Sequence, residues 1–191
     1  MWRRFLGDPS AVPKGQYLSV GMYSGYSYSR GHLHITGPNW EDPVDLVPGF
    51  LSDADDIDLK MHIWAYKRCR ALMLSTKFCT NELSILRPRF PEGSDAASTN
   101  PTPKYTTEDD EAIAQFIREN VATTWHSLGT CKMAPFEKNG VVDSKLNVYG
   151  VEGLKCCDLS IAPQMVAANT CNTAYVVGER GADIIMKEFG W

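Results

Sequence analysis

One histidine in this chain has neighbours that suit proton-transfer chemistry. His126 follows Trp125 in the run Thr124-Trp125-His126-Ser127-Leu128-Gly129-Thr130-Cys131-Lys132-Met133, near the end of a predicted helical segment. Asn169 offers a second polar side chain 43 residues later, where the last helix is predicted to begin. A neutral imidazole accepts a proton near pH 7. His126 is therefore the candidate general base, although a structural histidine gives the same sequence signal.

Other polar residues fit both a functional and a structural interpretation. Asn169 is also a preferred helix N-cap residue, and Asp158 is also a common turn residue. His32 and His34 are two positions apart, so they share one face of a predicted strand and could bind a metal ion. No third ligand stands at a suitable spacing, and we therefore predict no metal site.

Length and composition define a globular chain and exclude some classes of partner. The 191 residues are 43% hydrophobic and 22% charged, which is enough for one sizeable core. A net charge of -4 and the lack of Lys/Arg blocks argue against nucleic acid and an anionic membrane as partners. No apolar run has the length of a membrane span, and no hydrophobic signal region follows the charged start. We predict neither a membrane anchor nor a signal peptide.

The cysteine pattern indicates an intracellular protein. The six cysteines form no C-x-x-C pair, so we predict neither a zinc framework nor an evident disulfide scaffold. Free thiols favour a reducing compartment, which leaves both the cytoplasm and the peroxisome open. The chain ends in Phe189-Gly190-Trp191, which is not a peroxisomal targeting tripeptide.

Residue patterns predict an α+β fold in which helices back an antiparallel sheet. Alternation of apolar and small polar residues predicts strands over 16–28 and 31–36. The proline-containing stretch 39–52 is predicted to be a loop, and short strands are predicted over 140–158.

Three helices are predicted from caps and helical spacing. The first begins near a capping Ser52 and ends at about Ser75, and five of its residues fall at helical spacing: Ile57, Met61, Trp64, Arg68 and Leu72. The Met and Trp positions are expected to form a stripe that faces the core. The second begins after a cap at Thr106 with an acidic first turn. The stretch 87–105 before it contains four prolines and is predicted to be a surface connection. The last helix is predicted from Asn169 or Thr170 to Lys187.

Four motifs in order resemble the glucose-methanol-choline (GMC) flavin oxidoreductases. They are the WHSLGTCKM run, the turn Asp158-Leu159-Ser160-Ile161-Ala162-Pro163, the helix start at Asn169, and Gly178-Glu179-Arg180-Gly181-Ala182-Asp183. The segment Ser29-Arg30-Gly31-His32-Leu33-His34-Ile35 also fits the place where the substrate domain of that family resumes its sheet. The likeness covers roughly Ser19 to Phe189 and looks closest to the alcohol (methanol) oxidases of fungi.

The resemblance implies a flavoenzyme that oxidises a short primary alcohol, passes electrons to O2 and releases H2O2. It assigns 16–139 to the substrate-binding domain and 140–191 to a returning segment of the FAD-binding domain. His126 and Asn169 are implied at the reacting centre, and the implied FAD contacts are Trp125, Cys157, Asp158, Thr170 and Thr173. A homo-oligomer is possible on the same ground.

The sequence departs from this family pattern in one large respect. No G-x-G-x-x-G run is present, although a dinucleotide-binding fold needs one after a strand. The chain therefore resembles the C-terminal third of such an enzyme, and we expect the N-terminal FAD-binding region to be absent and the chain alone to be inactive. The alternative is a truncated, non-catalytic remnant or interaction module that keeps only the fold.

Overall fold

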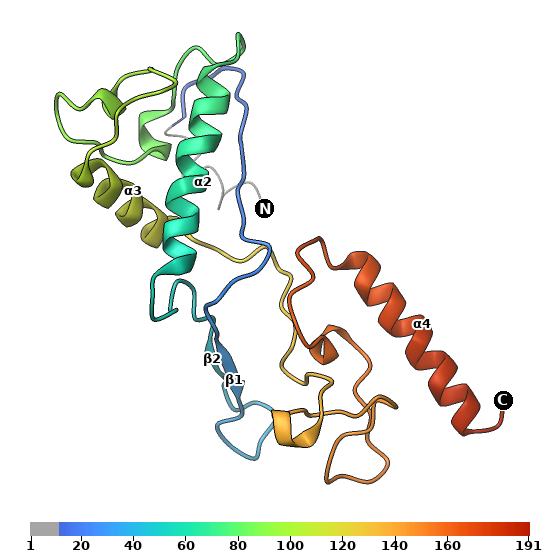
Figure 1. Ribbon diagram of the computed structural model, residues 1–191. Helices are drawn as coiled ribbons and strands as arrows, with labels where there is room; N and C mark the ends of the chain where they lie inside the picture. The colour runs from blue at the N-terminus through green and yellow to red at the C-terminus, as the bar shows by residue number, and fades with distance from the viewer. Residues whose placement is uncertain (1–11) are drawn as a thin grey trace. The chain divides into compact units, whose positions relative to one another are not determined.

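The computed structural model describes residues 12–191, which form two compact units (Figure 1). The first unit comprises residues 12–24 and 51–121, and the second comprises residues 25–50 and 122–191. Three α-helices and one two-stranded antiparallel sheet make up the longer regular elements of the described chain. The predicted α+β class is confirmed, whereas the predicted domain boundary after residue 139 stays a prediction.

Two helices form the centre of the first unit. Helix α2 spans Ile57–Leu74 and helix α3 spans Thr107–Asn120. A capping box starts α3, because the Thr106 hydroxyl accepts from the Asp109 N–H at 3.2 Å while the Asp109 carboxylate accepts from the Thr106 N–H at 2.8 Å. The predicted cap at Thr106 is confirmed. The buried residues of α3 include Ile113, Ala114 and Ile117.

The start of α2 differs from the prediction. Ser52 is not the cap, because the helix begins only at Ile57, after Asp56 has taken the left-handed conformation with φ 52. The carboxylate of Asp53 accepts instead from the N–H groups of Ile57 at 2.5 Å and Asp58 at 3.3 Å. A side chain one position after the expected cap therefore satisfies the first free backbone donors.

The buried face of α2 is also the opposite of the predicted one. Trp64 and Leu72 are 62% and 65% exposed, so the predicted stripe faces solvent in the first unit. The helix instead packs Leu59 with Ile63 and Tyr66 against its neighbour α3, in a cluster centred on the fully buried Ile113. Both faces of α2 carry apolar residues, and periodicity alone could not show which of them meets α3.

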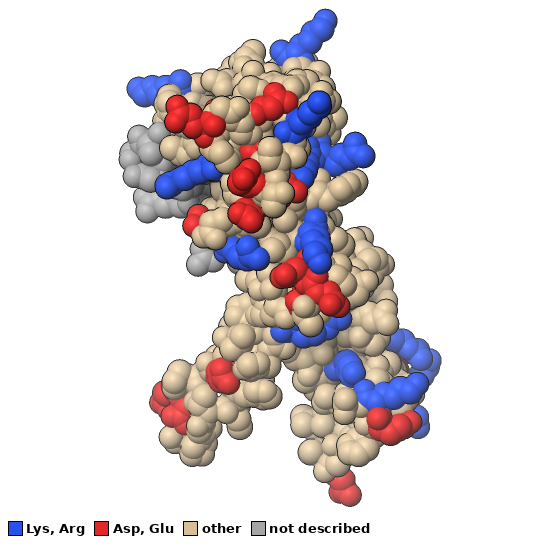
Figure 2. Space-filling view, turned by 60° about the vertical axis from the view of Figure 1, so that its left-hand side comes forward, with Lys and Arg blue, Asp and Glu red and all other residues tan. Residues whose placement is uncertain are grey.

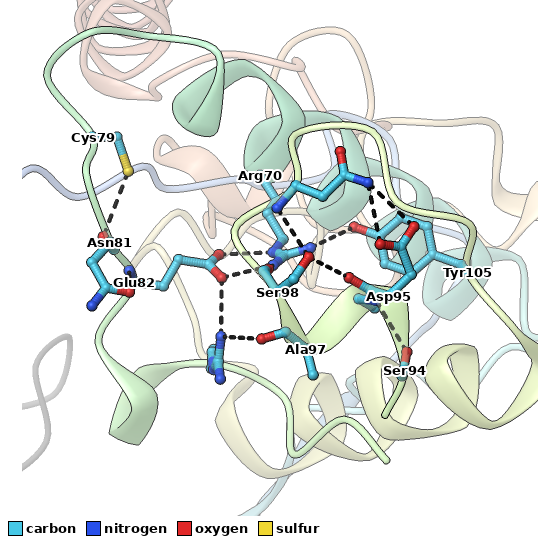
Figure 3. Close-up of polar contacts among 12 residues, drawn as sticks. Arg70, Cys79, Asn81, Glu82, Ser94, Asp95, Ala97, Ser98 and Tyr105 are labelled. Atoms are coloured by element: carbon cyan, nitrogen blue, oxygen red, sulfur yellow. Dashed lines mark hydrogen bonds and ion pairs between the residues drawn. The ribbon is translucent and has the colours of Figure 1, made fainter. Parts of the chain in front are cut away.

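A buried arginine ties the connection between the two helices to α2 (Figure 3). Arg70 donates to both carboxylate oxygens of Glu82 at 2.8 Å, to the Ser98 carbonyl at 2.6 Å and to the Tyr105 hydroxyl at 3.3 Å. Burial disfavours the charge, but the hydrogen bonds to Glu82 and Tyr105 hold the pKa of Arg70 above its ordinary value. Pro88 and Ala96 are also buried, so the prediction that 87–105 is only a surface connection is wrong.

The sheet of the second unit is smaller than predicted. Strands β1 (His32–His34) and β2 (Asp45–Val47) pair antiparallel. Residues 16–28 form no strand, so the strand predicted there is wrong. Strand β2 lies inside the stretch 39–52, which was predicted to be a loop. Alternation shows only that a segment can pair, whereas pairing also needs a partner strand. Strands β1 and β2 belong to the second unit and helices α2 and α3 to the first, so the predicted backing of the sheet by these helices stays a prediction.

The remainder of the second unit is built from turns, single bridges, short 3-10 helices and one α-helix. Bridges join Met133 to Val142, Val142 to Val148, and Asn147 to Lys155, where short strands were predicted. A core forms around Val142, Leu146 and Ile161, and helix α4 (Cys171–Glu188) contributes Val177 and Ile184 to it.

Charged side chains of both signs lie on the described surface. On the face drawn in Figure 2, acidic and basic side chains are interspersed, with no broad field of one sign. None of the helices within residues 12–191 combines the length and apolar character needed to cross a bilayer.

Candidate active site

The segment that carries His126 is irregular rather than helical. Helix α3 ends at Asn120, and Val121 is already extended, so the predicted position of His126 near a helix end is wrong. Trp125 has a left-handed backbone, with φ 60, and its N–H donates to the Thr123 hydroxyl at 2.9 Å. Positive φ in a bulky residue is uncommon and needs support from its surroundings. Trp125 is 52% exposed, and His126 is half-buried.

Main-chain hydrogen bonds fix the residues that follow His126. The N–H groups of Gly129, Cys131 and Met133 donate to the carbonyls of Leu159, Ser160 and Ile161 at 3.2, 2.9 and 2.8 Å. Gly129 has φ +85, and a Cβ there would lie 3.2 Å from the Ala162 carbonyl oxygen. This position therefore favours glycine, both for its backbone and for the close approach of the turn. We call these three bonds the main-chain tie.

The turn on the other side of the tie contains two of the predicted cofactor contacts. The Asp158 carboxylate accepts from the Ser160 N–H at 2.8 Å, and hydrogen bonding from Ser160 lowers the pKa of Asp158. Cys157 donates its thiol to the Val177 carbonyl of α4 at 3.5 Å. A Cβ on Gly181 of α4 would lie 1.8 Å from the same sulfur atom. The turn is thus packed directly against α4.

The N-cap position of α4 is held by Thr170, whereas Asn169 lies one residue earlier. The helix begins at Cys171, slightly later than predicted, and the Asn169 side-chain oxygen accepts from the Cys171 N–H at 3.2 Å. Asn169 therefore satisfies a free donor at the helix end from the position before the N-cap, so the prediction of Asn169 as the N-cap is wrong. Thr170 is buried, whereas Asn169 is exposed, and Ala167 just before them has a left-handed φ of 53.

An apolar hollow of about 410 Å³ lies where these segments meet. Its lining includes Met133 from the segment after His126, Ile161 from the turn, and Thr173 and Val177 from α4. The structure therefore brings three of the predicted segments together within one unit. No hydrogen bond joins His126 to Asn169 in the described chain, and sequence patterns did not single out Met165 or Val166, which also line the hollow.

A family model described as GMC oxidoreductase matches residues 27–178. This chain belongs to the GMC oxidoreductase family. The chain is 34% identical to an alcohol oxidase of Pichia angusta, in an alignment that covers 98% of this chain and 36% of that protein. A protein of Monascus purpureus named dehydrogenase mpl7 is 33% identical, over 91% of this chain and 25% of its own length. The chain thus spans little more than a third of the alcohol oxidase that it matches.

Solved structures of GMC members resemble this chain as well. A fungal aryl-alcohol oxidase matches 87% of the chain and 25% of its own chain, with a TM-score of 0.66 and 28% identity. An FAD-dependent oxidoreductase from Chaetomium thermophilum matches 86% of the chain and 26% of its own, with a TM-score of 0.65 and 25% identity. The resemblance of the sequence to GMC oxidoreductases, and to alcohol oxidases among them, is confirmed.

Proposed function

We propose that this chain supplies the proton-accepting side of a flavin-dependent alcohol oxidation. The observation that carries the proposal is the main-chain tie, which holds the segment after His126 against the Asp158 turn beside the apolar hollow. His126 is half-buried, and a neutral imidazole can take the proton of a bound hydroxyl group. His126 is not among the residues that line the hollow, and Met133 of the same segment is. The side-chain amide of Asn169 is the proposed donor to the substrate oxygen, since its carbonyl oxygen already accepts from Cys171.

The hollow and the end of α4 fit one wall of an FAD site. FAD, when bound, supplies the acceptor for the hydride that leaves the alcohol carbon. The first-turn N–H groups of α4 have no acceptor within the helix and carry partial positive charge, which suits an electron-rich ring edge or an anion. We assign Thr173, Thr170, Cys157 and Asp158 to this wall, with the exposed ring of Trp125 as an apolar contact.

The proposed overall reaction converts a short primary alcohol and O2 into an aldehyde and H2O2. His126 would take the hydroxyl proton of the alcohol. FAD held against the α4 wall would accept the hydride and pass two electrons to O2, which takes up two protons to give H2O2. The likeness to alcohol oxidases supports O2 as the acceptor. The chain also matches a protein named a dehydrogenase. O2 as the electron acceptor is therefore a proposal.

The chain by itself is proposed to bind FAD weakly and to oxidise no alcohol. Most of the affinity for a dinucleotide is expected at a glycine-rich turn of a Rossmann fold, and the sequence contains no such run. Titration of FAD into residues 1–191, followed by flavin fluorescence and by peroxide release with methanol, tests this. A stoichiometric yellow complex that releases peroxide would overturn the proposed division of labour.

The role of His126 is tested in a chimera in which this chain replaces the matching part of the Pichia angusta alcohol oxidase. His126→Ala should lower the rate of flavin reduction by an alcohol by about 10²–10⁴-fold while the bound FAD absorbance persists. His62→Ala is the matched control, because His62 lies on α2, where its Nδ1 is 2.7 Å from the Asp58 carbonyl oxygen. An unchanged reduction rate in the His126 variant would remove this residue from the mechanism.

A further inference from the structure

Four segments of the second unit close on one another through their backbones. They are residues 129–133, 141–143, 146–149 and 154–161. Single bridges join the first segment to the second, the second to the third, and the third to the fourth. The main-chain tie joins the fourth segment back to the first. The backbone thus forms a closed ring, and each segment contributes apolar side chains to the core around Val142, Leu146 and Ile161.

Two cysteines from opposite ends of this ring approach each other. Cys156 packs against the core, and Cys131 stands two residues before Met133, which packs against the same core. Cys131 and Met133 both donate their N–H groups to the tie, and alternate residues of such a segment carry their side chains on the same face. Burial raises the pKa of the Cys156 thiol, and charge interaction and a hydrogen bond with Cys131 raise it further. The two thiols are therefore neighbours, and both are free and half-buried.

We propose that Cys131 and Cys156 form a reversible disulfide when hydrogen peroxide reaches them. Peroxide is a product of the oxidation proposed above, so the source of the oxidant rests on that function, whereas the reactivity of the pair does not. Disulfides in reducing compartments are typically transient and respond to oxidants. The cross-link would join the segment after His126 covalently to the residues beside Asp158.

The oxidation balances in two steps. The raised pKa keeps Cys156 protonated, so Cys131 attacks peroxide first, as the thiolate. Its sulfur takes one oxygen atom while the O–O bond breaks, which leaves a sulfenic acid and releases hydroxide that becomes water. The Cys156 sulfur then attacks the Cys131 sulfur, the S–O bond breaks, and a second water leaves. The two thiols lose two electrons and two protons in total, and one H2O2 becomes two waters.

The arrangement selects Cys156 over the cysteine next to it. The thiol of Cys157 donates to the Val177 carbonyl of α4 at 3.5 Å, so it is directed toward the helix. Cys157 and Cys171 are exposed, whereas Cys131 and Cys156 are half-buried. Exposure alone would therefore favour oxidation of the first two residues, and proximity favours a disulfide between the other two.

Peptide mapping of the 191-residue chain tests the pairing. The folded protein is treated with H2O2, its remaining thiols are blocked with N-ethylmaleimide, and trypsin then releases residues 119–132 and 156–180. We expect these peptides as one cross-linked species, about 2 Da lighter than their sum because two hydrogen atoms are lost. Dithiothreitol added before the blocking step should remove this species. Cys131→Ser and Cys156→Ser should each lack it.

Cys157→Ser is the matched control, since it removes the adjacent thiol and should keep the cross-link. Hydrogen exchange gives a second readout: peroxide should slow exchange at residues 129–133 and 156–161 in the wild-type chain and in Cys157→Ser, but not in Cys156→Ser. A cross-link that persists in Cys156→Ser, or oxidation of Cys157 and Cys171 without any cross-link in the wild-type chain, would overturn the proposal. Because the peroxide is added, neither result depends on whether the parent enzyme produces it.

Discussion

The two units of this chain differ in what holds them together. The first unit closes a pair of helices around Ile113, which is fully buried, and locks its long connection with the ionic bonds of Arg70 to Glu82. The second unit relies on single bridges and on the main-chain tie, and it leaves Tyr175 and Val176 of α4 71% and 67% exposed. Both units expose apolar side chains, among them Trp64 and Leu72 of the first. A buried side-chain ion pair locks the first unit, whereas main-chain bonds hold the turns of the second.

This difference assigns separate tasks to the two units. A domain that must hold a large apolar cofactor cannot bury all its own apolar surface beforehand, so part of its stability has to come from what it binds. The first unit closes its helix pair around Ile113 with its own residues. The variants below test whether stability is concentrated in the first unit, beginning with the largest expected effect.

Replacing the buried arginine should have the largest effect on stability. Arg70→Met keeps apolar bulk but leaves Glu82 with only Arg87 as an ionic partner, at 3.4 Å. Loss of one member of a buried pair costs about 3–5 kcal/mol, which urea unfolding of the 191-residue chain would measure. Hydrogen exchange should show the loss in α2 and α3 and not in α4. Adding Glu82→Gln to Arg70→Met should recover part of it, and a loss below about 1 kcal/mol would contradict the assigned role.

A change at the contact between the Asp158 turn and α4 should have an intermediate effect. Gly181→Ala places a methyl group where the Cys157 sulfur atom lies, at 1.8 Å from the new carbon, so the turn or the helix must shift. Such overpacking costs about 1–3 kcal/mol. Exchange should increase at residues 157–161 and in α4, while α3 stays protected. Gly178→Ala is the control, because a Cβ at that position meets no atom within 4 Å; an equal effect of both variants would speak against the contact.

The capping box of α3 should make the first unit sensitive to acid. Burial would raise the pKa of Asp109, but hydrogen bonds from Ser94 and Thr106 outweigh it and lower the pKa below the ordinary value. A lowered folded-state pKa adds stability above the unfolded pKa of about 3.9, and this stability is lost as the pH falls through the folded-state pKa. Asp109→Asn should therefore reduce the free energy of unfolding by about 1 kcal/mol at pH 7. That difference should shrink below about pH 4, and a constant difference from pH 7 to pH 3 would refute this explanation.

The smallest effect is expected at an exposed ion pair of the second unit. Arg180 pairs with Asp183 on α4, where the Arg180 side chain is 66% exposed and Lys187 also contacts Asp183. Exposed pairs of this kind contribute about 0–1 kcal/mol. Arg180→Ala should thus leave urea unfolding nearly unchanged at 0.15 M salt, in contrast to Arg70→Met. If Arg180→Ala lowered the free energy of unfolding as much as Arg70→Met does, the proposed concentration of stability in the first unit would be wrong.

Local signals predicted the helices better than the sheet. The cap and acidic turn of α3 lie within a few residues of one another, so the sequence shows them directly. The face of α2 depends on which neighbour it meets, and that is not a local property. Strand β2 was missed because pairing is non-local and prolines flank the segment at positions 43 and 48.

The sequence predicted the motifs of the candidate site but not how their segments contact one another. Motif order identified His126, Asp158 and Asn169 together with the family, and their roles stay predictions. The contacts that join these segments are made largely by backbone atoms and by a glycine. Every residue has the same backbone atoms, so no distinctive side chain signals these contacts. The N-cap preference of asparagine predicted the neighbourhood of the helix start but not the position, because Thr170 is the N-cap and Asn169 accepts from Cys171 one residue earlier.

The main-chain tie has a consequence for how this region can evolve. Its donors and acceptors are peptide groups, so substitutions at Cys131, Met133 or Ser160 that keep the backbone shape leave the tie intact. Only Gly129 is restricted, by its positive φ and by the nearby Ala162 carbonyl. Side chains of the hollow that lie outside the core, such as Met165 and Val166, can therefore change without breaking the main-chain tie.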